Sequence, residues 1–93
     1  NRIGVFEQIY KVLIPDCYLF ITDILKKDGK NTKALEEDLD IPELLTMDAY
    51  KELLFNCNFS IVNVLDYTKL IDNKILYDSI NKLSYKIIIC KKN

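Results

Sequence analysis

Apolar side chains recur at helical spacing between residues 2 and 13, at Phe6, Ile9, Tyr10 and Leu13. This spacing predicts an amphipathic helix, which Pro15 ends. The pair Pro15-Asp16 predicts a turn, because proline fixes φ at the first turn position and aspartate can bond its own backbone. The next stretch, Tyr18–Asp23, is mainly apolar. It predicts a buried strand that ends on an acid.

A polar connection follows this strand. Ile24–Asn31 has the composition of a loop, and Thr32–Leu39 predicts a short helix, capped by Asn31 or Thr32, that ends before Pro42. A connection as long as Lys26–Pro42 is either a lid over a ligand crevice or a surface insertion without a role. The residues leave both alternatives open.

The best-defined helix begins at Thr46, whose hydroxyl can cap the first turn. Leu45 and Tyr50 have the spacing of a hydrophobic staple, which supports this start. One apolar face follows, made by Met47, Tyr50, Leu53, Leu54 and Cys57. Asn58 stands where a left-handed C-terminal cap is expected. The helix is therefore expected to end just before Asn58.

The rest of the chain continues the alternation of helix and strand. Ser60–Leu65 predicts a strand that closes on Asp66, Lys69–Leu83 predicts a helix, and Tyr85–Cys90 predicts a last strand. Strands with near-continuous apolar runs are typical of a sheet covered on both faces. The chain is therefore expected to be an α/β protein. Its 93 residues suffice for one domain of marginal stability at most.

Composition narrows the possible partners. The net charge of −1 argues against nucleic acid as the main partner, and no apolar run reaches the roughly 20 residues that a membrane span needs. Cys17, Cys57 and Cys90 lack paired spacing and the chain has no histidine, so a metal site is not expected. Unpaired cysteines are typical of a reducing compartment. We therefore expect a cytoplasmic protein.

Most arrangements of catalytic residues are absent from the sequence. The lack of histidine excludes Ser-His and Cys-His nucleophile pairs. Gly4 and Gly29 are the only glycines, so no glycine-rich loop follows a strand to bind a phosphate or a dinucleotide. We therefore assign no catalytic, cofactor-binding or metal-binding residue to this chain.

Two acids at predicted strand ends remain as candidates. Asp23 ends the predicted central strand and faces the long connection, and the carboxyl ends of parallel strands form the ligand crevice of α/β sheets. A carboxylate there could hold a cationic or hydroxylic substrate. Asp66 ends the second strand and is explained at least as well as a turn former or helix cap, a role that is also open for Asp23.

The order of these segments resembles a known family. Phe6–Asp23 is similar to the part of class I S-adenosylmethionine-dependent methyltransferases in which a helix precedes Arg/Lys-Val-Leu-x-Pro-Gly-Gly and an apolar strand ending in Asp. Leu45–Leu54 and Asn58–Thr68 resemble that family's helix, Gly-Phe turn and strand ending in Asp-x-Thr. The combination is most similar to the branch that methylates small amines such as phosphoethanolamine and sarcosine. Asp16-Cys17 and Asn58 depart from glycines of the family pattern.

The resemblance covers nearly the whole chain but only the C-terminal half of the family. It implies a single partial domain over residues 1–93, with strands five to seven of a Rossmann-like seven-stranded sheet and their flanking helices. The last strand would run antiparallel between the other two. The glycine-rich loop and the ribose-binding acid would lie upstream of Asn1. S-adenosylmethionine would therefore be bound mainly by a missing N-terminal half.

For function, the resemblance implies the substrate side of a methyltransferase. Asp23, Ile24 and the Lys26–Pro42 connection would face a small-molecule acceptor, an amine such as phosphoethanolamine, and Tyr67 is a lesser candidate. The partner would be the N-terminal half or another copy of the chain. The alternative is a non-catalytic α/β interaction module that pairs its exposed first strand with a partner chain.

Overall fold

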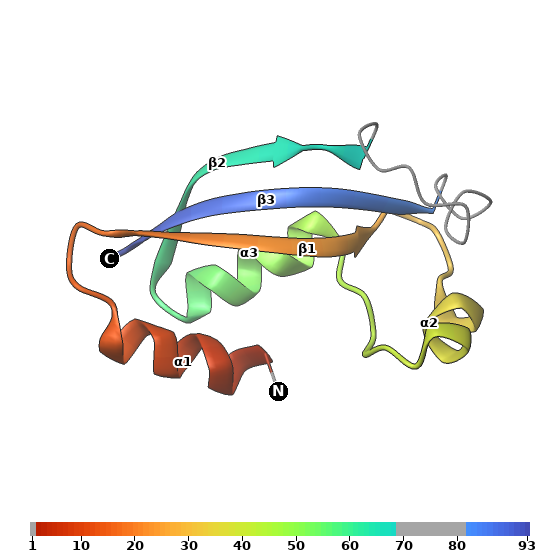
Figure 1. Ribbon diagram of the computed structural model, residues 1–93, viewed down its shortest axis with the longest axis horizontal. Helices are drawn as coiled ribbons and strands as arrows, with labels where there is room; N and C mark the ends of the chain where they lie inside the picture. The colour runs from red at the N-terminus through yellow and green to blue at the C-terminus, as the bar shows by residue number, and fades with distance from the viewer. Residues whose placement is uncertain (1, 69–81) are drawn as a thin grey trace.

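The computed structural model describes residues 2–68 and 82–93 (Figure 1). Its elements, in order, are α1 (Arg2–Val12), β1 (Tyr18–Lys26), α2 (Lys33–Leu39), α3 (Met47–Asn56), β2 (Phe59–Asp66) and β3 (Leu83–Lys92). Each of these elements was predicted from the sequence at nearly the same position. Most of the helix predicted over Lys69–Leu83 lies outside the described residues. Its predicted end is wrong, because Lys82 is in a turn and Leu83 begins β3.

The sheet has the strand order β1-β3-β2, and β3 runs antiparallel to both neighbours. β1 and β2 are therefore parallel to each other, and their carboxyl ends lie at the same end of the sheet. This is the arrangement that the family resemblance implied, with the last strand antiparallel between the other two. Among the described strands, β1 and β2 form the two edges.

β1 is longer than the sequence predicted. It continues past Asp23 to Lys26, where Ile24 pairs with Tyr85 and Lys26 with Leu83. The prediction that a loop begins at Ile24 was therefore wrong. The physical reason is the partner strand, because β3 supplies hydrogen-bonding groups as far as Leu83.

Both α1 and α3 lie on one face of the sheet, and the core forms between them and the strands (Figure 1). Phe6 of α1 makes edge-to-face contacts with Tyr50 of α3 and Phe59 of β2. The central strand contributes Ile88 and Cys90, both with no exposed surface. We call this side of the sheet the helix-covered face.

Local signals define α3 as predicted. The Thr46 hydroxyl accepts a hydrogen bond from the Ala49 N–H at 3.2 Å. Asn58 has a φ of 66°, the left-handed conformation expected at this position. At α2, by contrast, Thr32 precedes the helix without a capping bond from its side chain, and Asn31 Oδ1 accepts the Lys33 N–H instead.

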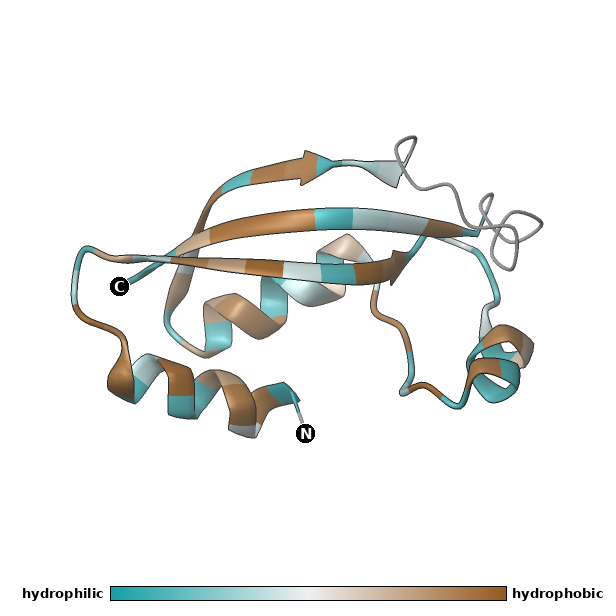
Figure 2. Ribbon diagram, in the orientation of Figure 1, coloured by the Kyte–Doolittle hydropathy of each residue, from teal (hydrophilic) through white to brown (hydrophobic). Residues whose placement is uncertain are grey.

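Figure 2 shows apolar residues along β1, β2 and β3. We call the side of the sheet opposite the helices the open face. Paired residues share a face, so Phe20 of β1 lies beside Ile89 of β3. Tyr18 is 54% exposed and Phe20 is 64% exposed. The expectation of a sheet covered on both faces is therefore wrong for β1, whose alternating exposure is that of a strand packed on one side only.

Candidate functional site

The two acids singled out in the sequence lie in one row across the sheet. Asp23 of β1 and Asp66 of β2 are both paired with Lys86 of β3, so all three side chains emerge on the helix-covered face. The Lys86 Nζ lies 4.0 Å from Asp66 Oδ2. The strand register thus brings together residues that are far apart in the chain, and Lys86 was not expected from the sequence.

Asp23 is half-buried and each of its oxygens accepts a hydrogen bond. Oδ2 accepts from the Tyr50 hydroxyl at 2.8 Å, and Oδ1 accepts from the Ile24 N–H at 2.8 Å. Burial and the neighbouring Asp23 both raise the pKa of Tyr50, so its hydroxyl stays protonated and can donate. In this structure Asp23 therefore joins β1 to α3.

Asp66 forms a turn at the end of β2. Its Oδ1 accepts bonds from the Thr68 hydroxyl at 2.5 Å and the Thr68 N–H at 2.9 Å, and these bonds hold the pKa of Asp66 below its usual value. This supports the interpretation of Asp66 as a turn former. A hollow of about 210 Å³ adjoins it, lined by Lys26, Lys27, Asp28, Met47, Asp66, Ser84 and Lys86.

Ile24 and Tyr67 lie on the other side of the sheet from Asp23. Ile24 pairs with Tyr85, and the Tyr67 N–H donates to the Tyr85 carbonyl at 3.0 Å. The rings of Tyr67 and Tyr85 have centroids 6.0 Å apart. The structure therefore brings Ile24 and Tyr67 to one tyrosine but separates both from Asp23.

Tyr85 was missed by the sequence analysis. It is 6% exposed, and its buried hydroxyl has no hydrogen-bond partner among the residues that the structure describes. Burial, followed by the nearby Tyr67, raises the pKa of Tyr85. The only signal in the sequence was its position at the start of a predicted strand, which does not distinguish a buried tyrosine from an ordinary sheet residue.

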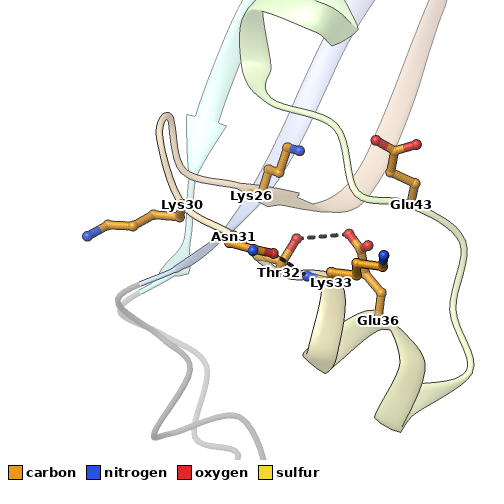
Figure 3. A pocket seen from close by; sticks show the side chains of 7 residues that line it. All are labelled: Lys26, Lys30, Asn31, Thr32, Lys33, Glu36 and Glu43. Carbon is orange, nitrogen blue, oxygen red and sulfur yellow. Dashed lines mark hydrogen bonds between the residues drawn. The ribbon is translucent and has the colours of Figure 1, made fainter.

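The connection after β1 encloses a hollow of about 530 Å³ at the carboxyl end of that strand (Figure 3). Its lining is polar and charged and consists of Lys26, Lys30, Asn31, Thr32, Lys33, Glu36 and Glu43. We call it the connection hollow. The predicted excursion Lys26–Pro42 therefore contributes most of the lining of this hollow.

Hydrogen bonds hold the connection in this shape. Glu36 Oε2 accepts from the Leu44 N–H and from the Thr32 hydroxyl, each at 2.8 Å, and these bonds lower the pKa of Glu36. Thr32 is only 3% exposed. The Glu43 carbonyl accepts a bond from Arg2 of α1 at 2.7 Å. These hydrogen bonds join α2 to the segments before and after it, and they join the later segment to α1.

The described lining of the connection hollow does not fit S-adenosylmethionine on its own. Among the described residues, this lining includes no aromatic or large apolar side chain on which an adenine could stack. Gly29, the glycine that follows β1, is part of a single turn in which the Lys30 N–H donates to the Lys27 carbonyl.

Within the described residues, no group of three or more Cys, Asp and Glu side chains is placed to hold a metal ion. The same part of the chain contains no helix of the length and apolarity that would cross a membrane.

Comparison with solved structures identifies the fold. The complete chain superposes on a structure from Galdieria sulphuraria, named a "putative sarcosine dimethylglycine methyltransferase", with a TM-score of 0.75 and 13% sequence identity. This chain therefore shares the fold of part of that protein. This chain covers 48% of that protein's length. The arrangement of β1, β3 and β2 therefore occurs inside a larger methyltransferase fold, as the resemblance implied.

Comparisons of sequence add nothing to this structural match. No protein-family model matches the chain. No curated protein matches it either. At 13% identity the structural match establishes the fold alone, so the residues of this methyltransferase half-fold have to be assigned from their own geometry.

Proposed function

We propose that this chain is the substrate side of an S-adenosylmethionine-dependent methyltransferase that acts on a small amine such as phosphoethanolamine. The observation that supports this is the match of its full length to a methyltransferase fold at a TM-score of 0.75. The chain spans 48% of the matched protein. A second part, an N-terminal half or another copy of the chain, would therefore supply the cofactor site and complete the sheet.

Methyl transfer needs an acceptor nitrogen that is aligned with the methyl donor and shielded from water. The Lys26–Pro42 connection follows the edge strand β1, the strand that would adjoin the second part, and its hydrogen bonds give it a defined shape. We infer that it covers the acceptor. Its position at the carboxyl end of β1 agrees with the usual place of ligands in α/β sheets.

Asp23 is proposed to orient the amine. Each of its carboxylate oxygens accepts one hydrogen bond in this structure, and a carboxylate oxygen can accept two. A further donor such as an ammonium group could therefore bind without displacing Tyr50. Ile24 and Tyr67 would contact the acceptor only from the open face, and we retain them as lesser candidates.

A methyl-transfer assay with a radiolabelled donor tests the proposal. The chain would be combined with the N-terminal half of a small-amine methyltransferase and offered phosphoethanolamine, sarcosine and dimethylglycine. We expect product with at least one amine and a lower rate for Asp23→Asn. The control is Asp16→Asn, because Asp16 is exposed and lies before β1 at the opposite end of the strand. Equal rates for Asp23→Asn and Asp16→Asn would show that Asp23 does not orient the acceptor.

Calorimetry with S-adenosylmethionine tests whether the second part, and not this chain, supplies the cofactor site. We expect no measurable binding by this chain alone, because the described lining of the connection hollow offers no surface for adenine. Tight binding by the isolated chain would contradict the proposed location of the cofactor site. The assay needs no knowledge of the acceptor.

A second candidate function is a non-catalytic interaction module. The observation that favours it is the edge strand β1, whose nine residues lack a second partner strand among the described elements and expose Tyr18 and Phe20. If this is the function, the chain should form a stable complex or oligomer. Replacing both Tyr18 and Phe20 by lysine should prevent this association. The control is Val12→Lys on α1, at a residue that is 79% exposed and is not part of the edge strand. A wild-type chain that forms neither an oligomer nor a complex would refute this alternative.

We also propose a cytoplasmic location. The supporting observation is that Cys17, Cys57 and Cys90 are all free thiols, and Cys17 is exposed. Free exposed thiols are kept reduced in the cytosol. Fractionation of cells that express the tagged protein would test this, and recovery with secreted proteins would contradict it.

A further inference from the structure

The backbone of β1 shows which of its hydrogen-bonding groups point to the free edge of the sheet. The N–H groups of successive residues in a strand point alternately to its two sides. The Lys26 N–H donates to the Leu45 carbonyl at 3.0 Å, away from β3. The next N–H, that of Lys27, donates to Lys82, which directly precedes β3. The N–H groups of the even-numbered residues of β1 therefore point to the free edge.

The carboxyl-terminal part of this edge is already occupied. Figure 1 shows the segment between α2 and α3 reaching the end of β1, where Leu45 accepts the Lys26 N–H. The preceding outward N–H, that of Ile24, donates to the carboxylate of Asp23 at 2.8 Å. A further strand that ran past Asp23 would have to displace this side chain and then the segment at Leu45. From Ile24 onwards the edge is therefore closed.

The amino-terminal part of the edge is open. Among the described residues, the outward N–H groups of Phe20 and Thr22 donate to no partner on this side. The five residues Tyr18–Thr22 carry no charge and include neither proline nor glycine. Natural edge strands that avoid further pairing usually carry lysine, proline or a bulge. Five residues of strand extend over roughly 17 Å, which is the length of an ordinary strand.

The other edge strand, β2, is protected. Its register with β3 is interrupted by an irregularity between Ile61 and Asn63. The Tyr67 N–H donates to β3, so the Val64 N–H, three residues earlier, points to the free edge. That N–H is bound by the Asn63 side chain at 2.8 Å. Bulges and local side-chain bonds both keep an edge from pairing further, so the sheet can grow only beside β1 among the described strands.

We propose that a strand of the second part pairs with β1 over Tyr18–Thr22 only and separates from it at Asp23. This inference rests on the proposed function, which places the second part beside β1, and adds where the contact ends. The partner segment is extended, about five residues long and uncharged, because a charge opposite these side chains would lose hydration without gaining a partner. The chain matches only 48% of the Galdieria sulphuraria protein, so the rest of such a protein, rather than a second copy, supplies the strand.

Separation of the two strands at Asp23 has a consequence for the acceptor. Strands that diverge at their carboxyl ends leave a crevice between them, which is where α/β sheets bind ligands. The hydrogen bond from Ile24 to Asp23 would thus end the pairing at the residue that is proposed to orient the amine. Asp23 would then be both the end of the interface and one wall of the crevice.

Amide hydrogen exchange of the complete chain, followed by nuclear magnetic resonance, tests whether the edge is divided in this way. We expect the amides of Phe20 and Thr22 to exchange roughly tenfold faster than the Ile24 amide, after correction for intrinsic rates, because only Ile24 donates a hydrogen bond at the edge. The Lys26 amide should also be slow, since it donates to Leu45. Equal rates at the four amides would overturn the division of the edge.

The same measurement on a complex tests the partner. The probe is the part of the Galdieria sulphuraria protein that this chain does not match, produced together with the chain. We expect it to slow the Phe20 and Thr22 amides by roughly tenfold or more and to change the Ile24 rate by less than about twofold. Slowing of Ile24 would place the partner strand beyond Asp23 and overturn the boundary. Slowing of Phe20 and Thr22 at rising concentration of the chain alone would identify a second copy and overturn the choice of partner, and no slowing in either case would overturn the interface.

Substitution of Asp23 tests whether its side chain closes the edge. Asp23→Ala removes the acceptor, so the Ile24 amide should exchange roughly tenfold faster in the chain alone and become protected by the probe. Asp23→Asn keeps an acceptor oxygen and should leave the Ile24 amide slow. The matched control is Tyr50→Phe, which removes only the bond to the other Asp23 oxygen. The Leu25 amide, which points toward β3, should stay slow wherever the sheet is intact. Equal acceleration of Ile24 in Asp23→Ala and Tyr50→Phe would show general loosening of β1 and overturn the role of Asp23.

Failure of this proposal can be distinguished from failure of the proposed function. Amide protection is measured without S-adenosylmethionine and without an acceptor, so the interface can be confirmed while no methyl transfer is detected. Methyl transfer in a complex whose protection extends to Ile24 would support the proposed function and contradict the boundary at Asp23.

Discussion

Replacing Tyr50 by phenylalanine removes one hydroxyl from the contact between β1 and α3. The Tyr50 hydroxyl donates to Asp23 Oδ2 at 2.8 Å, and Tyr50 is only 3% exposed. Phenylalanine keeps the ring and its edge-to-face contact with Phe6, whose centroid lies 6.2 Å away. The substitution therefore tests the hydrogen bond with little change in packing.

The expected cost follows from the charge and the exposure of the acceptor. A hydrogen bond to an ionised group contributes about 1.5–3 kcal/mol to stability. Asp23 is half-buried rather than enclosed, so a water molecule can replace part of the lost bond. We therefore expect Tyr50→Phe to lower the free energy of unfolding by about 1–2 kcal/mol.

Urea unfolding followed by circular dichroism measures this difference. The matched control is Tyr10→Phe, because the Tyr10 hydroxyl donates to the Asn93 carbonyl at 3.0 Å in an exposed position. Its loss should change the free energy of unfolding by less than about 0.5 kcal/mol. A Tyr50→Phe variant as stable as the parent, at an unchanged urea dependence, would refute the proposed link between β1 and α3.

Further predictions concern the backbone conformation at Asn58, the loss of stability at low pH and the reactivity of the cysteine thiols. Asn58→Ala should destabilise the protein by about 1 kcal/mol, and Asn58→Gly should not, because φ at this residue is 66°; equal urea midpoints would contradict this. The pKa of Glu36 is lower in the folded protein than in the unfolded chain, so its contribution to stability is present above its ordinary pKa and is lost as pH falls through the folded value. Glu36→Gln should therefore flatten the pH dependence of unfolding between about pH 5 and 3, and an unchanged slope would count against the bonds it accepts. A thiol reagent should modify Cys17 in the folded protein but reach Cys57 and Cys90 only on unfolding, since both are buried and burial raises the pKa of Cys90 to about 11. Rapid modification of a second cysteine in the folded protein would contradict the burial of these two residues.

Several elements could be predicted because their signals are local. Thr46 caps α3 through an N–H three residues away, and Asn58 adopts a left-handed conformation that its short polar side chain tolerates. The apolar period of residues 2–13 likewise predicted α1, because the stripe of a helix can be counted along the chain. None of these features depends on a distant strand.

The candidate site could be predicted only in part. Asp23 was found because it follows an apolar run, but its hydrogen bond to Tyr50 joins residues that are 27 positions apart. Adjacent residues in a strand point to opposite faces, and because the strand reaches Lys26, Asp23 and Ile24 lie on different sides of the sheet. The Glu36 side chain, which lines the connection hollow, accepts the Leu44 N–H eight positions along the chain, a contact that no spacing rule indicates.

The sequence by itself determined the order of helices and strands, the caps of α3 and the resemblance to part of a methyltransferase. These depend on neighbouring residues and on periods that repeat along the chain. Only the tertiary structure decided where β1 ends, which side chains share a face with Asp23, and that Lys86 lies between Asp23 and Asp66. The reason is that β3 pairs with both edges of the sheet from a distant part of the chain, and its register, not the local pattern, places each residue opposite its partner.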